Sequence, residues 1–372
     1  MRIGVPKEIK VHEYRVGMTP AAVREAEHHG HEVLVQSEAG LGIGLYDEDY
    51  RAAGATIVDS AEEIFARADM IVKVKEPQPG EWKMLRENQI LFTYLHLAPD
   101  PEPARGLLDS GCLAIAYETV TDSRGGLPLL APMSEVAGRM SIQAGAHCLE
   151  IAQGGRGQLL GGVPGVPAAK VVILGGGVSG TNAARMAMGL EAHVTVIDLN
   201  LHRLYELDTR FGASLNTIYS TVDSIEEHVL GADLVVGAVL VPGAAAPKLV
   251  SEAMVKQMKK GSVLVDIAID QGGCFATSHA TTHAEPTYVK HDVVHYCVAN
   301  MPGAVARTST FALNNATLPF TLALADKGYR QAMLDNPHLL AGLNIHKGEL
   351  TYRAVSDALG VPWRDAGSVL AA

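Results

Sequence analysis

Short aliphatic runs recur along the first third of the chain, separated by more polar segments. Helix-compatible stretches, such as 19–29 and 61–68, lie between most of these runs. Strands that alternate with helices are typical of a parallel sheet whose crossover helices cover both faces. We therefore predict a doubly wound α/β domain here, with strands at 3–5, 32–35, 56–58, 70–74, 90–95 and 113–117.

A different pattern begins at residue 170, where four aliphatic residues run into Gly175-x-Gly177-x-x-Gly180. A helix-compatible segment, 181–190, follows, and a second apolar run ends in Asp198. The first glycine permits a tight turn, the second lets the backbone approach a pyrophosphate, and the third lets helix and strand pack closely. Unpaired N–H groups at the helix N-terminus attract phosphates, and an acid at Asp198 can accept hydrogen bonds from a ribose. We interpret the segment as a dinucleotide-binding turn; the alternative is a glycine turn that binds nothing.

The remaining segments complete the domain plan. Residues 129–160 are interpreted as a long helical connection, and apolar runs at 234–240, 263–269 and 293–298 extend the second sheet. Beyond residue 304 the composition favours helices at 310–325, 331–334 and 352–359, with no new strands. We expect this tail to pack on the first domain. The predicted fold class is α/β, with two doubly wound Rossmann-like domains and an interdomain cleft: a discontinuous substrate domain, 1–130 plus 305–372, and a nucleotide-binding domain, 131–304.

Composition narrows the choice of partners and compartment. The 372 residues are 48% hydrophobic and carry a net charge of −11, which argues against nucleic acid or an acidic membrane as a partner. The N-terminus has the pattern of a strand and not of a signal peptide, and the weakly polar stretch 234–247 is too short to span a bilayer. Neither a CxxC pair nor a metal-ligand spacing occurs among the cysteines, so we expect a reduced, cytoplasmic setting. They are Cys112, Cys148, Cys274 and Cys297.

Candidate catalytic groups follow the predicted strands, because ligands of open parallel sheets bind beyond the carboxyl ends of the strands. Arg15 can hold a carboxylate by two parallel hydrogen bonds, and Lys75 adds a point charge for the same carboxylate or a carbonyl oxygen. His96 can exchange protons near neutral pH, and Asp270 can orient or deprotonate a nitrogen nucleophile. Each of these residues could instead be an ordinary surface group, and of Lys73 and Lys75, two apart on a strand, one could face solvent.

Seven segments together make the chain similar to the bacterial L-alanine dehydrogenase family. The resemblance runs almost from end to end, so it is far more specific than the glycine motif. The segments are 1–8 (MRIGVPKE), 13–20 (EYRVGMTP), 72–77 (VKVKEP), 94–97 (YLHL), 132–138 (PMSEVAG), 266–274 (DIAIDQGGC) and 298–304 (VANMPGA).

This resemblance implies an enzyme that interconverts L-alanine with pyruvate and ammonium, using NAD as cofactor. Arg15 and Lys75 match the family's substrate-binding residues, and His96 and Asp270 match its two catalytic residues. The glycine motif and the family's cofactor-contacting positions together predict an NAD site. Its residues are Ser134, Gly175, Gly177, Val178, Ser179, Gly180, Asp198, Arg203, Ser220, Val239, Leu240, Ile267, Ala268, Ile269, Asp270, Val298, Ala299, Asn300 and Met301.

The resemblance further implies a homohexamer built around contacts of the nucleotide domain. One departure is Ser278-His279-Ala280, where the family often has Ser-Arg-Pro, so an arginine near the cofactor is missing. Some members bind magnesium through an acid and a histidine, but Ala323 and Lys327 stand at those places, and we predict no metal site. Two other functions stay open: a related dehydrogenase acting on lysine or saccharopine, and the NAD(H)-binding component of a proton-translocating transhydrogenase.

Overall fold

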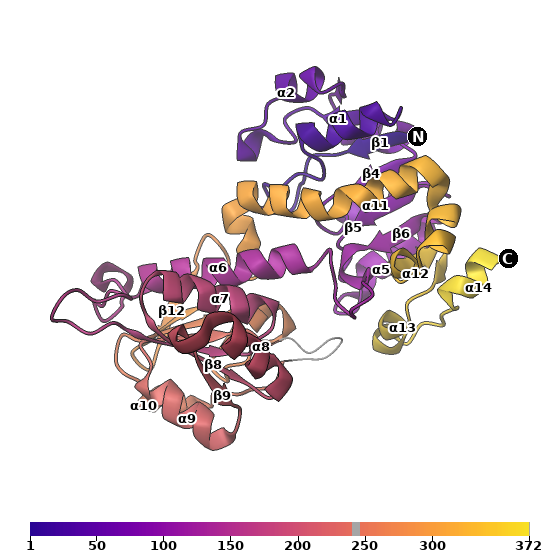
Figure 1. Ribbon diagram of the computed structural model, residues 1–372. Coiled ribbons are helices and arrows are strands. Elements are labelled where there is room, and N and C mark those ends of the chain that lie inside the picture. The colour runs from indigo at the N-terminus through magenta and orange to yellow at the C-terminus, as the bar shows by residue number, and fades with distance from the viewer. Residues whose placement is uncertain (240–245, 372) are drawn as a thin grey trace. The chain divides into compact units, whose positions relative to one another are not determined.

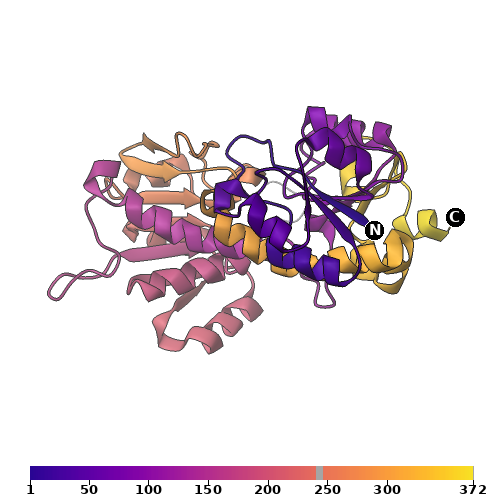
Figure 2. The same cartoon turned by 90° about the horizontal axis from the view of Figure 1, so that it is seen from above.

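The computed structural model describes residues 1–239 and 246–371 and divides into two compact units. Unit 1 contains residues 1–133 together with 305–371, and unit 2 contains residues 134–304. Both ends of the described chain therefore belong to unit 1 (Figure 1, Figure 2). Within the described residues, none of the helices combines the length and apolar character that crossing a membrane requires.

Unit 1 is built on a sheet with the strand order β15-β14-β6-β5-β4-β1-β2-β3. The strands from β1 to β6 pair in parallel, and their central members are buried on both faces because helices cover them. All strands predicted in this third of the chain form, and some end up to two residues earlier than expected. Their bounds are β1 Arg2–Val5, β2 Glu32–Gln36, β3 Thr56–Val58, β4 Met70–Val72, β5 Ile90–Thr93 and β6 Leu113–Ala116.

The helices of unit 1 begin where the sequence offers caps. Thr19 accepts a hydrogen bond from the N–H of Ala22 in front of α1, and Ser60 and Asp100 cap α3 and α5 in the same way. Proline occupies the first position of α1, α4 and α5, where no N–H partner is lost. The helices are α1 Pro20–His28, α2 Asp47–Ala52, α3 Ala61–Arg67, α4 Pro79–Trp82 and α5 Pro101–Ser110.

The C-terminal tail differs from the prediction of helices alone. Strands β14 (Leu343–His346) and β15 (Glu349–Leu350) extend the sheet, and β14 pairs antiparallel with β6. The sequence analysis missed them because so short a run becomes a strand only when the edge of β6 supplies its partners. The helices predicted at 310–325 and 331–334 lie on either side of a kink at Gly328, whose backbone is not helical, within the span α11 (Ala306–Asp335). It packs against α1, and α12 Pro337–Leu340, α13 Arg353–Leu359 and α14 Ala366–Ala371 follow (Figure 1).

Unit 2 contains a sheet with the order β12-β13-β11-β10-β7-β8-β9, parallel except for β12. Strands β9 and β12 were not predicted, because they lie at the sheet edges and their residues are exposed or half-buried, without a continuous apolar run. The predicted helical connection is α6 (Ala131–Cys148) alone, followed by a 3₁₀ turn and a loop. The strands are β7 Lys170–Leu174, β8 His193–Asp198, β9 Asn216–Tyr219, β10 Leu234–Gly237, β11 Val263–Asp266, β12 Thr287–Lys290 and β13 Val293–Tyr296; the other helices are α7 Val178–Gly189, α8 Leu201–Phe211, α9 Val222–Gly231 and α10 Glu252–Gln257.

Candidate active site

Three of the predicted site residues follow neighbouring parallel strands of unit 1. Arg15 lies in the connection after β1, Lys75 follows β4 and His96 follows β5, and these strands are adjacent in the order β1-β4-β5. Parallel strands end at the same edge of a sheet, so the three residues belong to one edge. Buried Tyr94 lies between two of them, because its ring stacks on His96 and its hydroxyl interacts electrostatically with Arg15.

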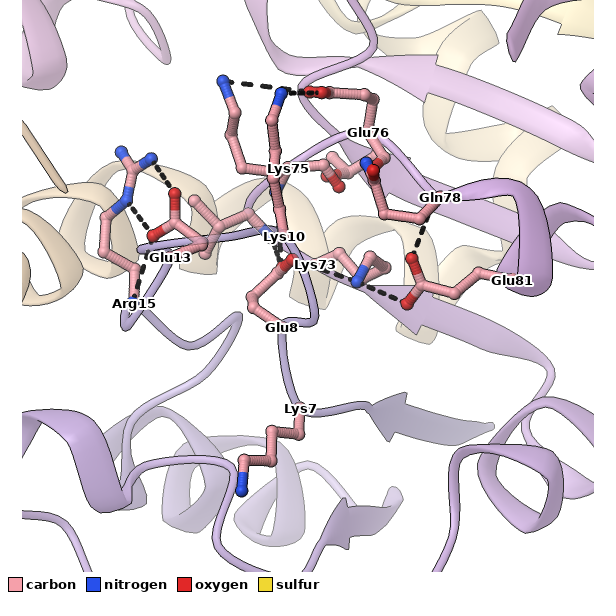
Figure 3. A network of polar contacts seen from close by, with 12 residues as sticks. Lys7, Glu8, Lys10, Glu13, Arg15, Lys73, Lys75, Glu76, Gln78 and Glu81 are labelled. Atoms are coloured by element: carbon pink, nitrogen blue, oxygen red, sulfur yellow. Dashed lines mark hydrogen bonds and ion pairs between the residues drawn. The ribbon is translucent and has the colours of Figure 1, made fainter. Parts of the chain in front are cut away.

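Arg15 is buried and held by Glu13. Its Nε donates to Glu13 Oε1 at 2.6 Å, its Nη2 donates to Glu13 Oε2 at 2.5 Å, and its Nη1 lies 3.1 Å from Met133 Sδ (Figure 3). Burial alone would lower the pKa of Arg15, but the hydrogen bonds to Glu13 and the nearby negative charges of Glu13 and Glu8 together outweigh burial and raise the pKa. The guanidinium thus has a fixed orientation, with its Nε–Nη2 edge turned to a carboxylate of the protein itself.

The two lysines after β4 have different surroundings, and neither one extends freely into solvent. Lys73 is fully buried, with its ammonium 3.0 Å from Glu8 Oε2 and 2.7 Å from Glu81 Oε1. The side chain of Lys75 is 13% exposed, and its ammonium lies 3.8 Å from Glu76 Oε2. Among the described residues the Lys75 ammonium makes no hydrogen bond, so Lys75 is the better candidate for binding a ligand.

The carboxylate of Glu76 interacts with the ammonium groups of two lysines. Lys10 forms an ion pair with its carboxylate, and the Lys75 ammonium points to the same group (Figure 3). Burial alone would raise the pKa of Glu76, but Lys75 and Lys10 outweigh burial and lower the pKa. Glu76 therefore stays ionised and holds Lys75 loosely.

His96 has an unusual backbone conformation, with φ at 48°. Its N–H donates to Glu118 Oε1 at 2.7 Å, and the preceding N–H of Leu95 donates to the same carboxylate. The imidazole is 45% exposed and stacks on Tyr94, whose hydroxyl donates to Leu129 O at 2.6 Å. Left-handed backbone at a non-glycine residue is held only where its surroundings demand it. The sequence analysis missed Glu118, although it lies directly after β6 and the rule that found the other residues would have found it too.

The glycine turn of unit 2 has the geometry that its sequence predicts. Gly175 has φ at 100°, and a Cβ added at Gly180 would lie 1.8 Å from Gly175 O. A Cβ at Gly177 would meet nothing within 4 Å, and Gly177 precedes α7 without any side-chain cap. The first and third glycines are therefore required by the fold, whereas the space at the second is available to a ligand.

Asp198 and Arg203 both contact this turn. Asp198 Oδ2 accepts from the N–H of Gly176 at 2.6 Å, and its Oδ1 accepts from the N–H of Asn200. The guanidinium of Arg203 donates to Gly176 O at 2.6 Å and to Thr181 Oγ1 at 2.7 Å. In this structure Arg203 thus fastens the turn to α7 and α8, and its predicted contact with the cofactor stays a prediction.

The other predicted cofactor residues follow further strands of the same sheet. Ser220 follows β9, Val239 follows β10, and Asp270 lies exposed in the 3₁₀ turn Ile267–Gln271 after β11. Residues 298–301 follow β13, and Asn300 has φ at 63°. Ser134 lies on α6, and Leu240 lies outside the described residues.

These features of unit 2 fit a dinucleotide. The open space at Gly177 and the uncapped helix N-terminus suit a pyrophosphate, and the half-buried carboxylate of Asp198 suits a ribose. His279, which replaces the family's usual arginine, stacks on Tyr288 with ring centroids 3.7 Å apart. Arg15, Lys75 and His96 belong to unit 1, whereas Asp270 and the predicted cofactor residues belong to unit 2.

Comparison with known proteins gives a family match for each of the two parts of the chain. Residues 4–137 match the model of the alanine dehydrogenase/PNT N-terminal domain, and residues 141–353 match that of the C-terminal domain. An alanine dehydrogenase of Halomonas elongata is 60% identical over 370 residues, covering 100% of both chains. The chain belongs to the alanine dehydrogenase/PNT family. The predicted resemblance is thereby confirmed.

Solved structures confirm the predicted α/β fold. One L-alanine dehydrogenase superposes with a TM-score of 0.94 at 52% identity, over 97% of this chain and 99% of that one. A transhydrogenase from Sinorhizobium meliloti has a TM-score of 0.81 at 23% identity, covering 95% of this chain and 100% of that chain. The second likeness shows a shared fold alone. The match to the C-terminal domain model ends at residue 353, so it also covers part of unit 1, including α11.

Proposed function

We propose that this protein is an L-alanine dehydrogenase, which converts L-alanine and NAD reversibly into pyruvate, ammonium and NADH. The observation that carries the proposal is the full-length identity of 60% to an alanine dehydrogenase, in a chain that retains Arg15, Lys75, His96 and Asp270. The arrangement of the first three at one edge of the unit 1 sheet supports the same function.

Arg15 and Lys75 hold the carboxylate of the substrate. Glu13 fixes the direction of the Arg15 guanidinium, so little side-chain entropy is lost when a carboxylate meets it. Lys75 is held only loosely by Glu76, and its ammonium can turn to the carboxylate or to the carbonyl oxygen of pyruvate. In the second position Lys75 would polarise the carbonyl bond and favour attack by ammonia.

Proton transfer is assigned to His96 and Asp270. NAD, when bound, accepts the hydride that leaves the α-carbon of L-alanine. Loss of the hydride leaves an imine, and His96 takes a proton from the water that adds to it. His96 then gives this proton to the nitrogen of the resulting carbinolamine, which leaves as the carbonyl of pyruvate forms. The Glu118 carboxylate keeps the ring in place through the backbone. Asp270 acts on the amino nitrogen of the substrate, either by accepting a proton from it or by orienting it. Ser134, Asp198 and the other predicted residues of unit 2 hold the cofactor.

We assign the protein to the cytoplasm, and the described cysteines, all free and buried, support a reducing compartment. We also propose that it assembles as a homohexamer, on the basis of the family resemblance.

The test is NADH formation by the purified protein with L-alanine, D-alanine, L-lysine and L-saccharopine. We expect activity with L-alanine and little with the others. Activity with lysine or saccharopine but not with alanine would assign the protein to another amino-acid substrate. NADH binding without any amino-acid turnover would favour a transhydrogenase component.

A further inference from the structure

The buried charges around Lys73 reach the proposed substrate lysine through its backbone. Glu8, whose side chain is 2% exposed, accepts hydrogen bonds from three successive residues after β4. Its Oε1 accepts from the N–H of Val74 at 2.7 Å and from that of Lys75 at 3.3 Å, and its Oε2 accepts from the Lys73 ammonium at 3.0 Å (Figure 3). One carboxylate thus ties the segment 73–75 to the chain leaving β1.

The position of the Lys75 ammonium depends on this backbone. Its nearest acidic partner is Glu76 Oε2 at 3.8 Å, which is too far for a hydrogen bond. A loose ion pair does not fix the direction of a flexible lysine chain. The place from which the chain starts is therefore set by the hydrogen bonds of the Lys75 backbone, to Glu8 and, at the carbonyl, from Thr93 Oγ1 at 3.0 Å.

We propose that Glu8 is a positioning residue, which places Lys75 for the substrate by holding the backbone of Val74 and Lys75 against the buried Lys73. This inference rests on the proposed role of Lys75 as a substrate ligand. The need for a carboxylate follows from the count of donors: both oxygens of Glu8 face N–H or ammonium donors. A glutamine has only one acceptor end, so it loses either the backbone or Lys73.

Glu81 offers a matched control. It is buried to the same extent and accepts from the same Lys73 ammonium at 2.7 Å. Its other oxygen accepts from the N–H of Gln78, at the start of α4, and not from Val74 or Lys75 (Figure 3). Glutamine at either position leaves fewer acceptors around the same buried ammonium, but only Glu8→Gln puts the contact with the backbone of Lys75 in competition with Lys73.

The experiment compares Glu8→Gln, Glu81→Gln and Lys75→Ala in steady-state kinetics with pyruvate, together with NADH binding and thermal unfolding. We expect Glu8→Gln to raise the KM for pyruvate about tenfold, as the loss of a charge-assisted hydrogen bond predicts, and Glu81→Gln to change it less than about twofold. Both should lower the melting temperature, and neither should change NADH affinity, since both residues belong to unit 1. Should Glu8→Gln not fold, Glu8→Asp keeps the buried charge but is too short for all three donors, and it should raise the same KM.

Equal pyruvate KM values in Glu8→Gln and Glu81→Gln would overturn the inference, as would an unchanged KM in a folded Glu8→Asp. The Lys75→Ala variant separates this failure from failure of the proposed function. If Lys75→Ala is inactive while the glutamate variants behave alike, only the role of Glu8 is wrong. If Lys75→Ala keeps normal kinetics, the substrate role of Lys75 is wrong as well.

Discussion

The two units offer their proposed ligands different kinds of group. Unit 1 presents charged side chains that other charges already hold, as Glu13 holds Arg15 and Glu76 holds Lys75. Unit 2 presents backbone N–H groups and the space left by a missing side chain at Gly177. We therefore expect substrate binding in unit 1 to depend on charged side chains, and NADH binding at the glycine turn of unit 2 to depend on the space at Gly177.

The largest effect is expected for Lys75→Ala. Removing the ammonium leaves the substrate carboxylate without one of its two cations, so kcat/KM for pyruvate should fall about 10³-fold or more. NADH binding, measured by fluorescence, should be unchanged. Lys7, which lies in the connection after β1 and pairs with Glu38 at the surface, is the control, and Lys7→Ala should behave like the wild type. Full activity of Lys75→Ala would remove Lys75 from the site.

Loss of the proton-transferring groups comes next. General acid–base catalysis contributes about 10²–10⁴-fold, so His96→Ala and Asp270→Asn should each lower kcat within that range. His96→Ala should keep its affinity for NADH, because His96 belongs to unit 1. Asp270→Asn should lose some affinity, because Asp270 lies among the predicted cofactor residues of unit 2. A His96→Ala enzyme that keeps most of its turnover would place the acid–base role elsewhere.

Adding a methyl group should separate folding from binding in unit 2. Gly177→Ala meets no protein atom within 4 Å, so the protein should melt at its normal temperature while NADH binds at least about tenfold more weakly. Gly180→Ala would place its Cβ 1.8 Å from Gly175 O and should lower the melting temperature as well. Titration with NADH and thermal unfolding distinguish the two. Normal NADH affinity in Gly177→Ala would show that no ligand occupies this space.

A smaller effect concerns the choice between NAD and NADP. The carboxylate of Asp198 would repel a 2′-phosphate, so the native enzyme should prefer NAD, and Asp198→Ala should relax that preference by about tenfold. NAD use should weaken too, because Asp198 also accepts from Gly176. Arg203 can assist the phosphate only by leaving Gly176 and Thr181, which limits the gain. The ratio of kcat/KM for the two cofactors is the measurement, with exposed Asp208→Ala as control; an unmoved ratio would contradict the role of Asp198.

The last prediction concerns stability in acid and not activity. Burial lowers the pKa of His295 to about 4, and its ring is hydrogen-bonded to Thr277 while neutral. Below pH 6.5 the unfolded chain binds a proton that the folded chain does not bind until about pH 4, so this contribution is present at neutral pH and is lost as the pH falls through that window. It amounts to about 3 kcal/mol at most. Unfolding in urea at pH 7 and pH 5 should show a smaller loss for His295→Gln than for the wild type, and an equal loss would exclude His295 as the cause.

The sequence by itself determined most of the fold and the family. Local patterns sufficed for the strands of unit 1 up to β6, because buried parallel strands are continuous apolar runs. The glycine turn could also be predicted from local sequence, since a Cβ at Gly180 would collide with a residue only five positions away. The rule that polar residues after parallel strands meet at one edge selected Arg15, Lys75 and His96 as candidates, and the structure places them at one edge of the unit 1 sheet.

Only the tertiary structure decided how those residues are held. Lys73 and Lys75 could not be distinguished by their positions in the sequence. They differ because Glu8 and Glu81, which belong to other segments, form ion pairs with the buried Lys73. Pairing of β14 with β6, more than two hundred positions apart, could not be predicted for the same reason. Contacts between residues far apart in the sequence decide which groups are already paired and which can still bind a ligand. A local sequence pattern does not contain these contacts.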